Sequence, residues 1–169
     1  MYKIIAIIGE SGSGKDTVLK KLIEANPNLH KIIPCTTRPM REGEVDGVDY
    51  LFLDNYYFAL KIKRGEMLEA TSFNDWFYGT SYDSLDESKI NVGVFNPEGV
   101  RNLFNYSDKI DAKIFRIESP ARLRLIRQLS REENPNIEEI IRRYGTDKTD
   151  FESLSFGYTS LRNETYEDL

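Results

Sequence analysis

A glycine-rich segment at residues 9–17 (GESGSGKDT) most constrains what this chain can fold into. It follows an apolar run at residues 4–8 and precedes an amphipathic run at residues 18–25. A strand, a glycine loop and a helix in this order form a phosphate-binding loop, or P-loop. Its backbone N–H groups and the positive end of the helix bind phosphate oxygens. The alternative is a glycine-rich turn without a ligand. The predicted ATP phosphate-binding residues are Gly9, Ser11, Gly12, Ser13, Gly14, Lys15, Asp16 and Thr17.

Lys15 and Asp16 carry the chemistry expected of this loop. Lys15 is predicted to be catalytic, because its ammonium group reaches the β- and γ-phosphates as a mobile point charge. The pattern G-x-x-x-x-G-K-[ST] has a hydroxyl side chain that meets Mg²⁺ where this chain has Asp16. A carboxylate can also hold hydrated Mg²⁺, directly or through water, so Asp16 is the candidate metal ligand. It repels a triphosphate unless the metal intervenes.

Composition excludes several other classes of function. The chain has 169 residues, a net charge of −5 and 40% hydrophobic residues, which predicts one domain and no nucleic-acid partner. One cysteine and one histidine exclude an internal disulfide and a metal site built on Cys or His. No apolar run reaches the roughly 18 residues of a membrane helix, and residues 4–8 are too short for a signal peptide. A cytoplasmic protein without a membrane partner is expected, and protein partners are left open.

Apolar runs and breaker residues predict alternating strands and helices. Strands are expected at residues 2–8, 32–33, 50–53, 67–73, 77–80, 90–95, 112–117 and 158–161. Helices are expected at residues 15–25, 55–64, 81–87, 97–106, 120–131 and 137–144. The fold class is therefore α/β, with a parallel P-loop sheet flanked by helices. Residues 34–80 are expected to form a small β-rich insert in a core of residues 1–33 and 81–169, all within a single domain.

Residues 36–80 carry a second group of motifs. The run TTRPMREGE at residues 36–44, followed by Gly47, Tyr50 and Phe52, resembles the nucleotide-binding signature of guanylate kinases. The stretches MLEA at residues 67–70 and FYGT at residues 77–80 resemble the second half of that signature. The resemblance spans roughly residues 3–145. It implies a P-loop kinase with an insert that binds a nucleoside monophosphate and with a helical lid.

Two arginines of the insert are suited to a phosphate. Planar guanidinium groups bind phosphate bidentately, so Arg38 and Arg41 together neutralise a dianionic monophosphate. Tyr50 and Tyr78 can donate hydroxyl hydrogen bonds to it. The resemblance assigns these four residues to the monophosphate, together with Glu44 at the end of the first motif, and gives Arg38 a catalytic role as well. Surface ion pairs between the arginines and the glutamates of the same motif are the alternative.

Glu69 is the candidate reader of the base. A carboxylate offers two acceptors to the N1–H and amino groups of guanine, whereas adenine presents an acceptor at N1. The resemblance gives the matching glutamate this role and also places Thr80 at the base. Two base-binding positions depart from the family, which has Ser where this chain has Pro34 and Asp where it has Asn96. An exposed strand carboxylate is the alternative for Glu69.

The helix predicted over residues 120–131 carries apolar side chains on one side and arginines on the other. The resemblance implies a lid over about residues 124–143. Its arginines would close over the transferring phosphoryl group and exclude water. A solvated helix face is the alternative. The predicted catalytic lid residues are Arg127, Arg131 and Arg143.

Together these features predict reversible transfer of the γ-phosphoryl group of ATP to GMP or dGMP, with Mg²⁺ as cofactor and ATP as co-substrate. The acceptor oxygen is ionised near neutral pH, so no general base is required. A ribose 1,5-bisphosphate kinase and a broader deoxynucleoside monophosphate kinase remain open as alternatives. A guanylate-kinase-like module that binds protein and has lost catalysis is the alternative from another class.

Overall fold

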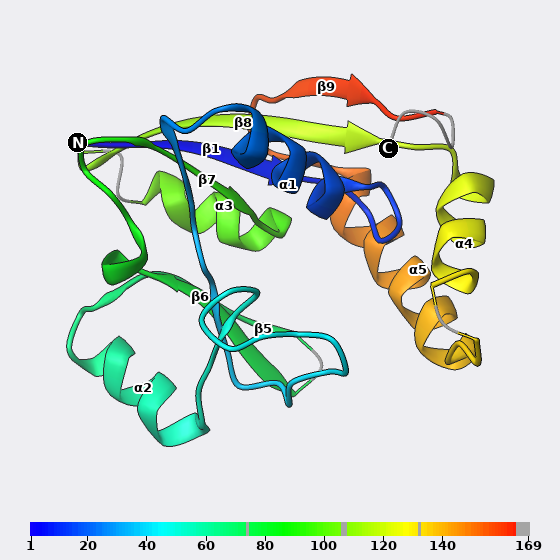
Figure 1. The fold of residues 1–169 in the computed structure, drawn as a ribbon, viewed down its shortest axis with the longest axis horizontal. Coiled ribbons are helices and arrows are strands. Elements are labelled where there is room, and N and C mark those ends of the chain that lie inside the picture. Colours follow the sequence, from blue (N-terminus) through cyan, green and yellow to red (C-terminus); the bar gives the residue numbers. More distant parts are fainter. Residues whose placement is uncertain (74, 106–107, 132, 165–169) are drawn as a thin grey trace.

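A computed structural model describes residues 1–73, 75–105, 108–131 and 133–164 (Figure 1). The helices are α1 (Lys15–Ala25), α2 (Asn55–Lys63), α3 (Pro97–Phe104), α4 (Ala121–Leu129) and α5 (Ile137–Glu152), and a 3₁₀ turn spans Tyr82–Ser84. The strands are β1 (Tyr2–Ile8), β2 (Leu29–Lys31), β3 (Cys35–Thr36), β4 (Leu51–Phe52), β5 (Met67–Phe73), β6 (Trp76–Ser81), β7 (Ile90–Val94), β8 (Ile110–Glu118) and β9 (Thr159–Arg162).

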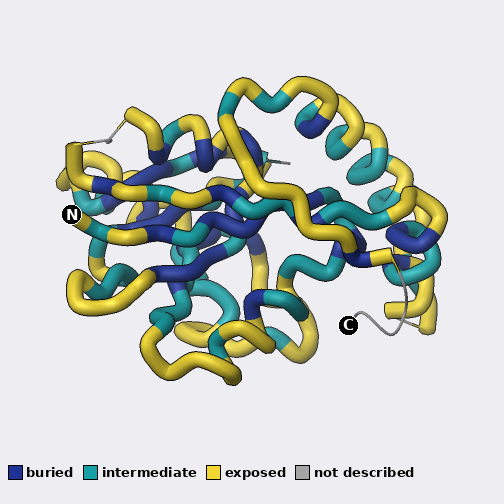
Figure 2. The backbone as a smooth tube through the Cα atoms, turned by 90° about the horizontal axis from the view of Figure 1, so that it is seen from above, coloured by how far each residue is buried: buried dark blue, intermediate teal, exposed yellow. Residues whose placement is uncertain are grey.

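Strand β1 forms the centre of a five-stranded sheet of order β2-β7-β1-β8-β9, in which all pairs are parallel. Side chains alternate along β1, so Ile4 packs on one face of the sheet and Ile7 on the other. Helix α1 covers the face of Ile7 through Leu19, and helices α3 and α5 cover the opposite face through Val100 and Phe151. Buried residues are concentrated along these strands (Figure 2). The predicted α/β fold with a helix-flanked parallel sheet is confirmed.

A second sheet, of order β4-β3-β6-β5, is built from residues 35–81. Strand β3 runs parallel to β4 and antiparallel to β6, which in turn runs antiparallel to β5. Helix α2 covers this sheet through Phe58, which packs on Cys35 and Met67. Asp54 caps α2 by accepting the Tyr57 N–H, as N-cap residues do. In Figure 1 this sheet and α2 form a lobe below the main sheet.

Several element boundaries differ from the predicted ones. Strand β2 ends at Lys31, before the predicted residues 32–33, because the chain turns towards the second sheet soon after Ile32 bonds to the Val92 carbonyl at 2.8 Å. The helix predicted over residues 81–87 is a 3₁₀ turn. Helix α5 continues past residue 144 to Glu152, since Phe151 packs into the core of the main sheet. The predicted end of α3 at residue 106 lies outside the described residues.

Candidate active site

The P-loop joins the end of β1 to the start of α1. Gly12 and Gly14 have φ angles of 78° and 92°, in the left-handed region that favours glycine. A Cβ atom on Gly12 would lie 2.4 Å from the Arg124 carbonyl oxygen, so α4 packs too closely for a side chain. Gly14 is the N-cap of α1, and within the described chain no side chain caps this helix. The first N–H groups of α1 are therefore available to an anion.

Carbonyl groups of the P-loop are bound by the segments that follow β8 and β9. The Ser13 carbonyl accepts hydrogen bonds from Asn163 Nδ2 at 2.8 Å and from Ser119 Oγ at 3.2 Å. Arg127 of α4 donates from Nη1 to the Gly12 carbonyl at 3.2 Å and from Nη2 to Asn163 Oδ1 at 3.2 Å. These bonds fix the shape of the loop without using its N–H groups.

Arg38 is held by Glu44 at the edge of the second sheet. Its Nη1 and Nη2 atoms donate to the two carboxylate oxygens of Glu44 at 3.0 and 2.7 Å, and the Arg38 side chain is 5% exposed. The guanidinium carbon lies 5.3 Å from the ring centroid of Tyr50 and 5.7 Å from that of Phe52. Burial raises the pKa of the Glu44 carboxyl group, but hydrogen bonds from the Arg38 side chain and the Arg41 backbone N–H, together with the charges of both arginines, lower it overall. The pair is therefore ionised and tightly oriented.

Positive charge is in excess around Arg41. Burial lowers the pKa of the Arg41 guanidinium, and the positive charges of Arg143 and Arg38 lower it further. Glu44 pairs with Arg38, and Glu139 is shared by Arg142 and Arg143, so two carboxylates face four guanidinium groups. An excess of this kind is suited to a phosphate dianion.

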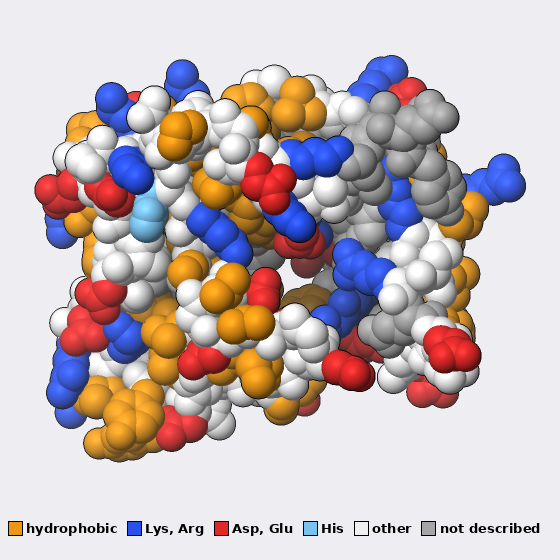
Figure 3. All heavy atoms as spheres, viewed as in Figure 1, with side chains coloured by type: hydrophobic (Ala, Val, Ile, Leu, Met, Phe, Trp, Pro, Cys, Tyr) orange, Lys and Arg blue, Asp and Glu red, His pale blue; other side chains and the backbone are white. Residues whose placement is uncertain are grey.

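One acidic residue of helix α5, Glu139, orients two arginines of the same helix. Glu139 accepts hydrogen bonds from Arg142 Nε at 2.8 Å and from Arg143 Nε at 2.7 Å. These bonds, that from Arg142 above all, lower the pKa of Glu139 to about 2. The Arg142 guanidinium carbon lies 5.1 Å from the ring centroid of Phe73 in β5, so α5 also touches the second sheet. Figure 3 shows a hollow between the two lobes with acidic and basic side chains on its rim.

Tyr50 and Tyr78 pack against each other beside Arg38 in the second sheet. Their rings pack edge to face with centroids 6.3 Å apart. Burial raises the pKa of Tyr50 to about 12, and the negative charge of Asp16 contributes to the shift. The Tyr50 hydroxyl therefore keeps its proton at neutral pH and remains a hydrogen-bond donor. The influence of Asp16 places Tyr50 within electrostatic range of the first turn of α1.

Glu69 of β5 is buried at the junction of the second sheet with α3. Burial raises its pKa to about 7, although hydrogen bonds from the Thr80 side chain and backbone oppose the shift. A Cβ atom on Gly99 would lie 3.2 Å from Glu69 Oε2, so the carboxyl group lies against the first turn of α3. Asn96 caps this turn by accepting the Gly99 N–H at 2.7 Å, and its Nδ2 donates to Thr71 Oγ1 at 3.2 Å. Glu69, Thr80 and Asn96 are thus brought together.

Pro34 directly precedes β3, in which Cys35 pairs with Gly79, the neighbour of Thr80, and its carbonyl accepts the Leu51 N–H at 2.8 Å. The predicted lid arginines lie on α4, just after it, and on α5. Arg127 lies against the P-loop backbone, and Arg131 is exposed beyond the end of α4. Arg143 is the predicted lid arginine whose positive charge lowers the pKa of Arg41.

Besides Ser119 and Asn163, the predicted site residues leave out Asp147 and Gln128, which also contact the P-loop. Asp147 of α5 accepts the Ser11 N–H at 2.6 Å, and Gln128 of α4 donates from Nε2 to the Ser11 carbonyl at 3.3 Å. Asp147 follows Arg143 by four residues and therefore shares its face of the helix. Continuing the helical period from Arg143 to Phe151 would have identified Asp147.

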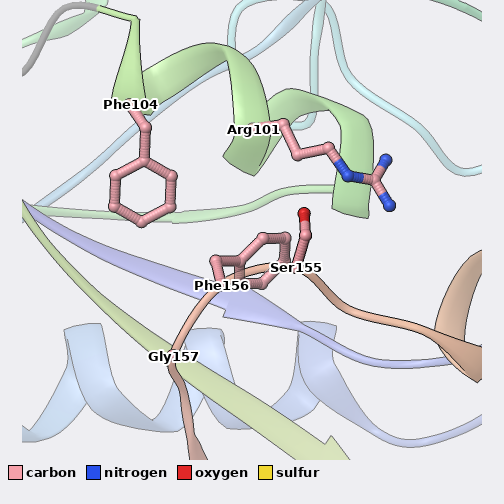
Figure 4. Close-up of a pocket in the computed structure, with 5 residues that line it drawn as sticks. All are labelled: Arg101, Phe104, Ser155, Phe156 and Gly157. Atoms are coloured by element: carbon pink, nitrogen blue, oxygen red, sulfur yellow. The ribbon is translucent and has the colours of Figure 1, made fainter.

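A cavity of about 520 Å³ lies away from these residues, between α3 and the segment after α5 (Figure 4). The rings of Phe104 and Phe156 lie 6.1 Å apart beside it, and the Arg101 side chain extends away from Phe104. Its lining contains none of the predicted site residues, so the cavity is not part of the candidate active site. It is lined by Arg101, Phe104, Ser155, Phe156 and Gly157.

Acidic side chains around the P-loop are few. Among the residues that the structure describes, no three His, Cys, Asp or Glu side chains gather so that they could hold a metal ion. Mg²⁺ is commonly held by one or two carboxylates together with substrate phosphates. Asp16, exposed on the first turn of α1 beside Lys15, fits that mode of binding. In the same described ranges, no helix is long and apolar enough to cross a bilayer.

Comparison with known proteins points to one family. A sequence model of the family described as guanylate kinase matches residues 1–167. A guanylate kinase from Helicobacter hepaticus is 37% identical over 116 residues, which are 66% of this chain and 58% of that protein. One from Enterococcus faecalis is 38% identical over 122 residues, which are 69% of this chain and 58% of that protein. The matched segments cover between 40% and 58% of such relatives, so the chain spans about half their length.

The fold has a counterpart among solved structures. The crystal structure of guanylate kinase from Anaplasma phagocytophilum matches with a TM-score of 0.71 and 20% identity, over 99% of this chain and 79% of that chain. At this identity the likeness shows the fold. The family match extends over both halves of the site, from the P-loop through Arg38 and Glu69 to α5. The chain therefore belongs to the guanylate kinase family.

Proposed function

We propose that this chain is an ATP-dependent guanylate kinase, which transfers the γ-phosphoryl group of ATP directly to GMP or dGMP. One observation carries the proposal: α5 touches both anion-binding regions, because Asp147 accepts the Ser11 N–H of the P-loop and Arg142 lies over the ring of Phe73, which packs against Tyr78. A single helix thus links the site for the donor phosphates to the site for the acceptor phosphate. Membership of the family favours this reaction over a ribose bisphosphate kinase, a broader kinase or a protein-binding module.

The donor site is formed by the P-loop and the first turn of α1. Backbone N–H groups of residues 9–17 bind the phosphates of ATP. Lys15, on a flexible side chain, stabilises the negative charge of the phosphoryl group during its transfer. Asp16 would hold Mg²⁺ together with the nucleotide phosphates. Bound Mg²⁺ offsets the negative charge of the phosphate oxygens. Arg127, bonded to the Gly12 carbonyl, keeps the loop in shape.

The acceptor site is formed by the second sheet. Arg41 and Arg38 bind the phosphate of GMP, and the hydroxyl groups of Tyr50 and Tyr78 donate to its oxygens. Glu44 orients Arg38 rather than touching the acceptor, since both of its oxygens are engaged by Arg38. The incoming oxygen is already ionised, so positioning and charge stabilisation account for catalysis.

Glu69 selects the base. Its ionised carboxylate accepts hydrogen bonds from N1–H and the amino group of guanine, with Thr80 and Asn96 beside it. Adenine would place an acceptor against the same carboxylate and leave it without a donor. Pro34 comes directly before Cys35, which pairs with Gly79 beside Thr80, so a hydroxyl at this position would lie near the base, and Pro34 supplies none.

Closure of the insert and lid excludes water. We infer an insert of residues 34–80 and a lid of about residues 124–143 within a single kinase domain. Arg143, and with it Arg131, would approach the transferring group as both substrates bind. Water is thereby kept from competing with GMP as the acceptor. A cytoplasmic enzyme that binds small nucleotides, and neither nucleic acid nor membrane, fits this chemistry.

A panel of acceptors in one ADP-release assay tests the proposal. We expect turnover with GMP and dGMP and little with AMP, CMP, UMP or ribose 1,5-bisphosphate. Comparable rates with all the nucleoside monophosphates would favour the broader kinase, and a preference for ribose 1,5-bisphosphate would replace the proposal. Absence of turnover with every acceptor, in protein that still binds GMP, would point to the protein-binding module.

A further inference from the structure

An acidic side chain occupies the mouth of the P-loop. The Ser11 N–H donates to Asp147 Oδ2 at 2.6 Å, across 136 residues of sequence. Both residues are half-buried, so water competes only partly for this bond. Hydrogen bonds from backbone N–H groups to carboxylates are short and strong, as they are to phosphate oxygens. Asp147 therefore stands in chemically for an anionic oxygen of a phosphate.

The peptide groups on both sides of Ser11 are held without α5. The Ser11 N–H shares a planar peptide group with the Glu10 carbonyl, which accepts the Ser13 N–H at 3.0 Å. On the other side, buried Gln128 donates from Nε2 to the Ser11 carbonyl at 3.3 Å. The direction of the Ser11 N–H is therefore set by the P-loop itself. An anion that replaces Asp147 would find this donor already oriented.

The bond also controls the position of α5. Five residues before Asp147, Arg142 lies over the Phe73 ring of β5, with its guanidinium carbon 5.1 Å from the ring centroid. While Asp147 is bound to Ser11, α5 is therefore attached to the P-loop and to the second sheet together. A triphosphate in the P-loop places negative charge beside this carboxylate, and like charges at such a distance repel.

We propose that Asp147 competes with the triphosphate of ATP for the Ser11 N–H, so that ATP binding releases the middle of α5 from the P-loop. The inference rests on the proposed binding of ATP to this loop. The attached state binds ATP poorly, so the apparent affinity for ATP falls in proportion to the fraction of molecules attached. A ligand must displace Asp147 from the Ser11 N–H before it can bind, so the free P-loop favours ligands with a high negative charge.

Two variants of Asp147 test the competition. Asp147→Asn keeps an oxygen acceptor for the Ser11 N–H but removes the charge, and Asp147→Ala removes both. The control is Asp150→Asn, which makes the same charge change on the same helix and whose carboxylate bonds to no P-loop residue within the described ranges. The measurement is the dissociation constant of a non-hydrolysable ATP analogue with Mg²⁺, by calorimetry without a monophosphate. Thermal melting checks that each variant is folded.

We expect both Asp147 variants to bind the analogue about fivefold more tightly or better, the size usual for coupling between a ligand and a conformational state. Asp150→Asn should bind as the wild type does. Unchanged or weaker binding by Asp147→Asn would overturn the competition and make Asp147 a positioning residue for the loop. A wild type that binds no analogue would overturn the proposed function itself, and the competition with it.

Discussion

Arg38 and Glu44 are joined by two parallel hydrogen bonds, of 3.0 and 2.7 Å, beneath the rings of Tyr50 and Phe52. The sequence left open an exposed ion pair between an arginine and a glutamate of this motif. The pair does form, but with Arg38 only 5% exposed it is not an exposed one. A buried, bidentate pair orients the guanidinium before a substrate arrives. Arg41, on which the positive charge of Arg143 also acts, supplies the charge that a phosphate requires.

Replacing Glu44 with Gln should weaken monophosphate binding. The amide keeps the shape of the carboxylate but bonds to Arg38 about half as strongly, so we expect the KM for GMP to rise about three- to tenfold. The KM for ATP should change little. Steady-state kinetics with each substrate varied in turn measures this. Glu42→Gln, an exposed neighbour, is the matched control. If only the KM for ATP rose, Glu44 would act on ATP binding, and its assignment to the GMP phosphate would be contradicted.

Arg41→Ala should mainly affect GMP. Loss of a charge-assisted hydrogen bond to phosphate costs about 1.5–3 kcal/mol, which corresponds to about a 10- to 100-fold rise in the KM for GMP. Arg64→Ala makes the same charge change at an exposed position just after α2 and should leave this constant unchanged. Calorimetry with GMP alone confirms the cause. Normal GMP binding by Arg41→Ala would contradict the assignment.

Affinity for GMP should depend on the protonation of Glu69. Burial raises the pKa of this carboxyl group to about 7 in the free protein, whereas guanine binds the ionised form. Binding then releases a proton, so the Kd of GMP should rise about tenfold for each pH unit below 7 and level off above it. The ligand phosphate also titrates, with a pKa of about 6. Glu69→Gln should bind weakly and show only the phosphate titration. If the Kd of GMP depended on pH in the same way in the wild type and in Glu69→Gln, ionisation of Glu69 would play no part in GMP binding.

Asp16 should set the magnesium requirement. Asp16→Asn removes the charge that holds the ion, so the Mg²⁺ concentration for half-maximal rate should rise. Asp16→Ser supplies the hydroxyl of the usual P-loop pattern and should need less Mg²⁺ than Asp16→Asn does. Titration of the rate with Mg²⁺ at saturating ATP and GMP measures both. If all three proteins share one Mg²⁺ curve, Asp16 does not contact the metal.

Local sequence was sufficient for some parts of this fold and not for others. The strand, P-loop and helix of residues 2–25 were predicted because apolar runs, glycines and the Asn26-Pro27 break act within a few residues. The length of α5 was not, since Gly145 lowers its helical propensity and packing of the distant Phe151 overrides that cost. The attachment of Asp147 to Ser11 depends on the same packing. No local pattern distinguishes Arg127, bonded to the P-loop, from Arg143, beside the insert.

Transfer of label from [γ-³²P]ATP to GMP, resolved by chromatography, tests the central claim most directly. The account predicts that ³²P appears in GDP in step with the ADP formed. It also predicts that Lys15→Ala abolishes the transfer with a normal melting temperature, and that Lys20→Ala, which alters an exposed lysine on the same helix, does not. Label released as inorganic phosphate, or transfer that survives in Lys15→Ala, would contradict the account.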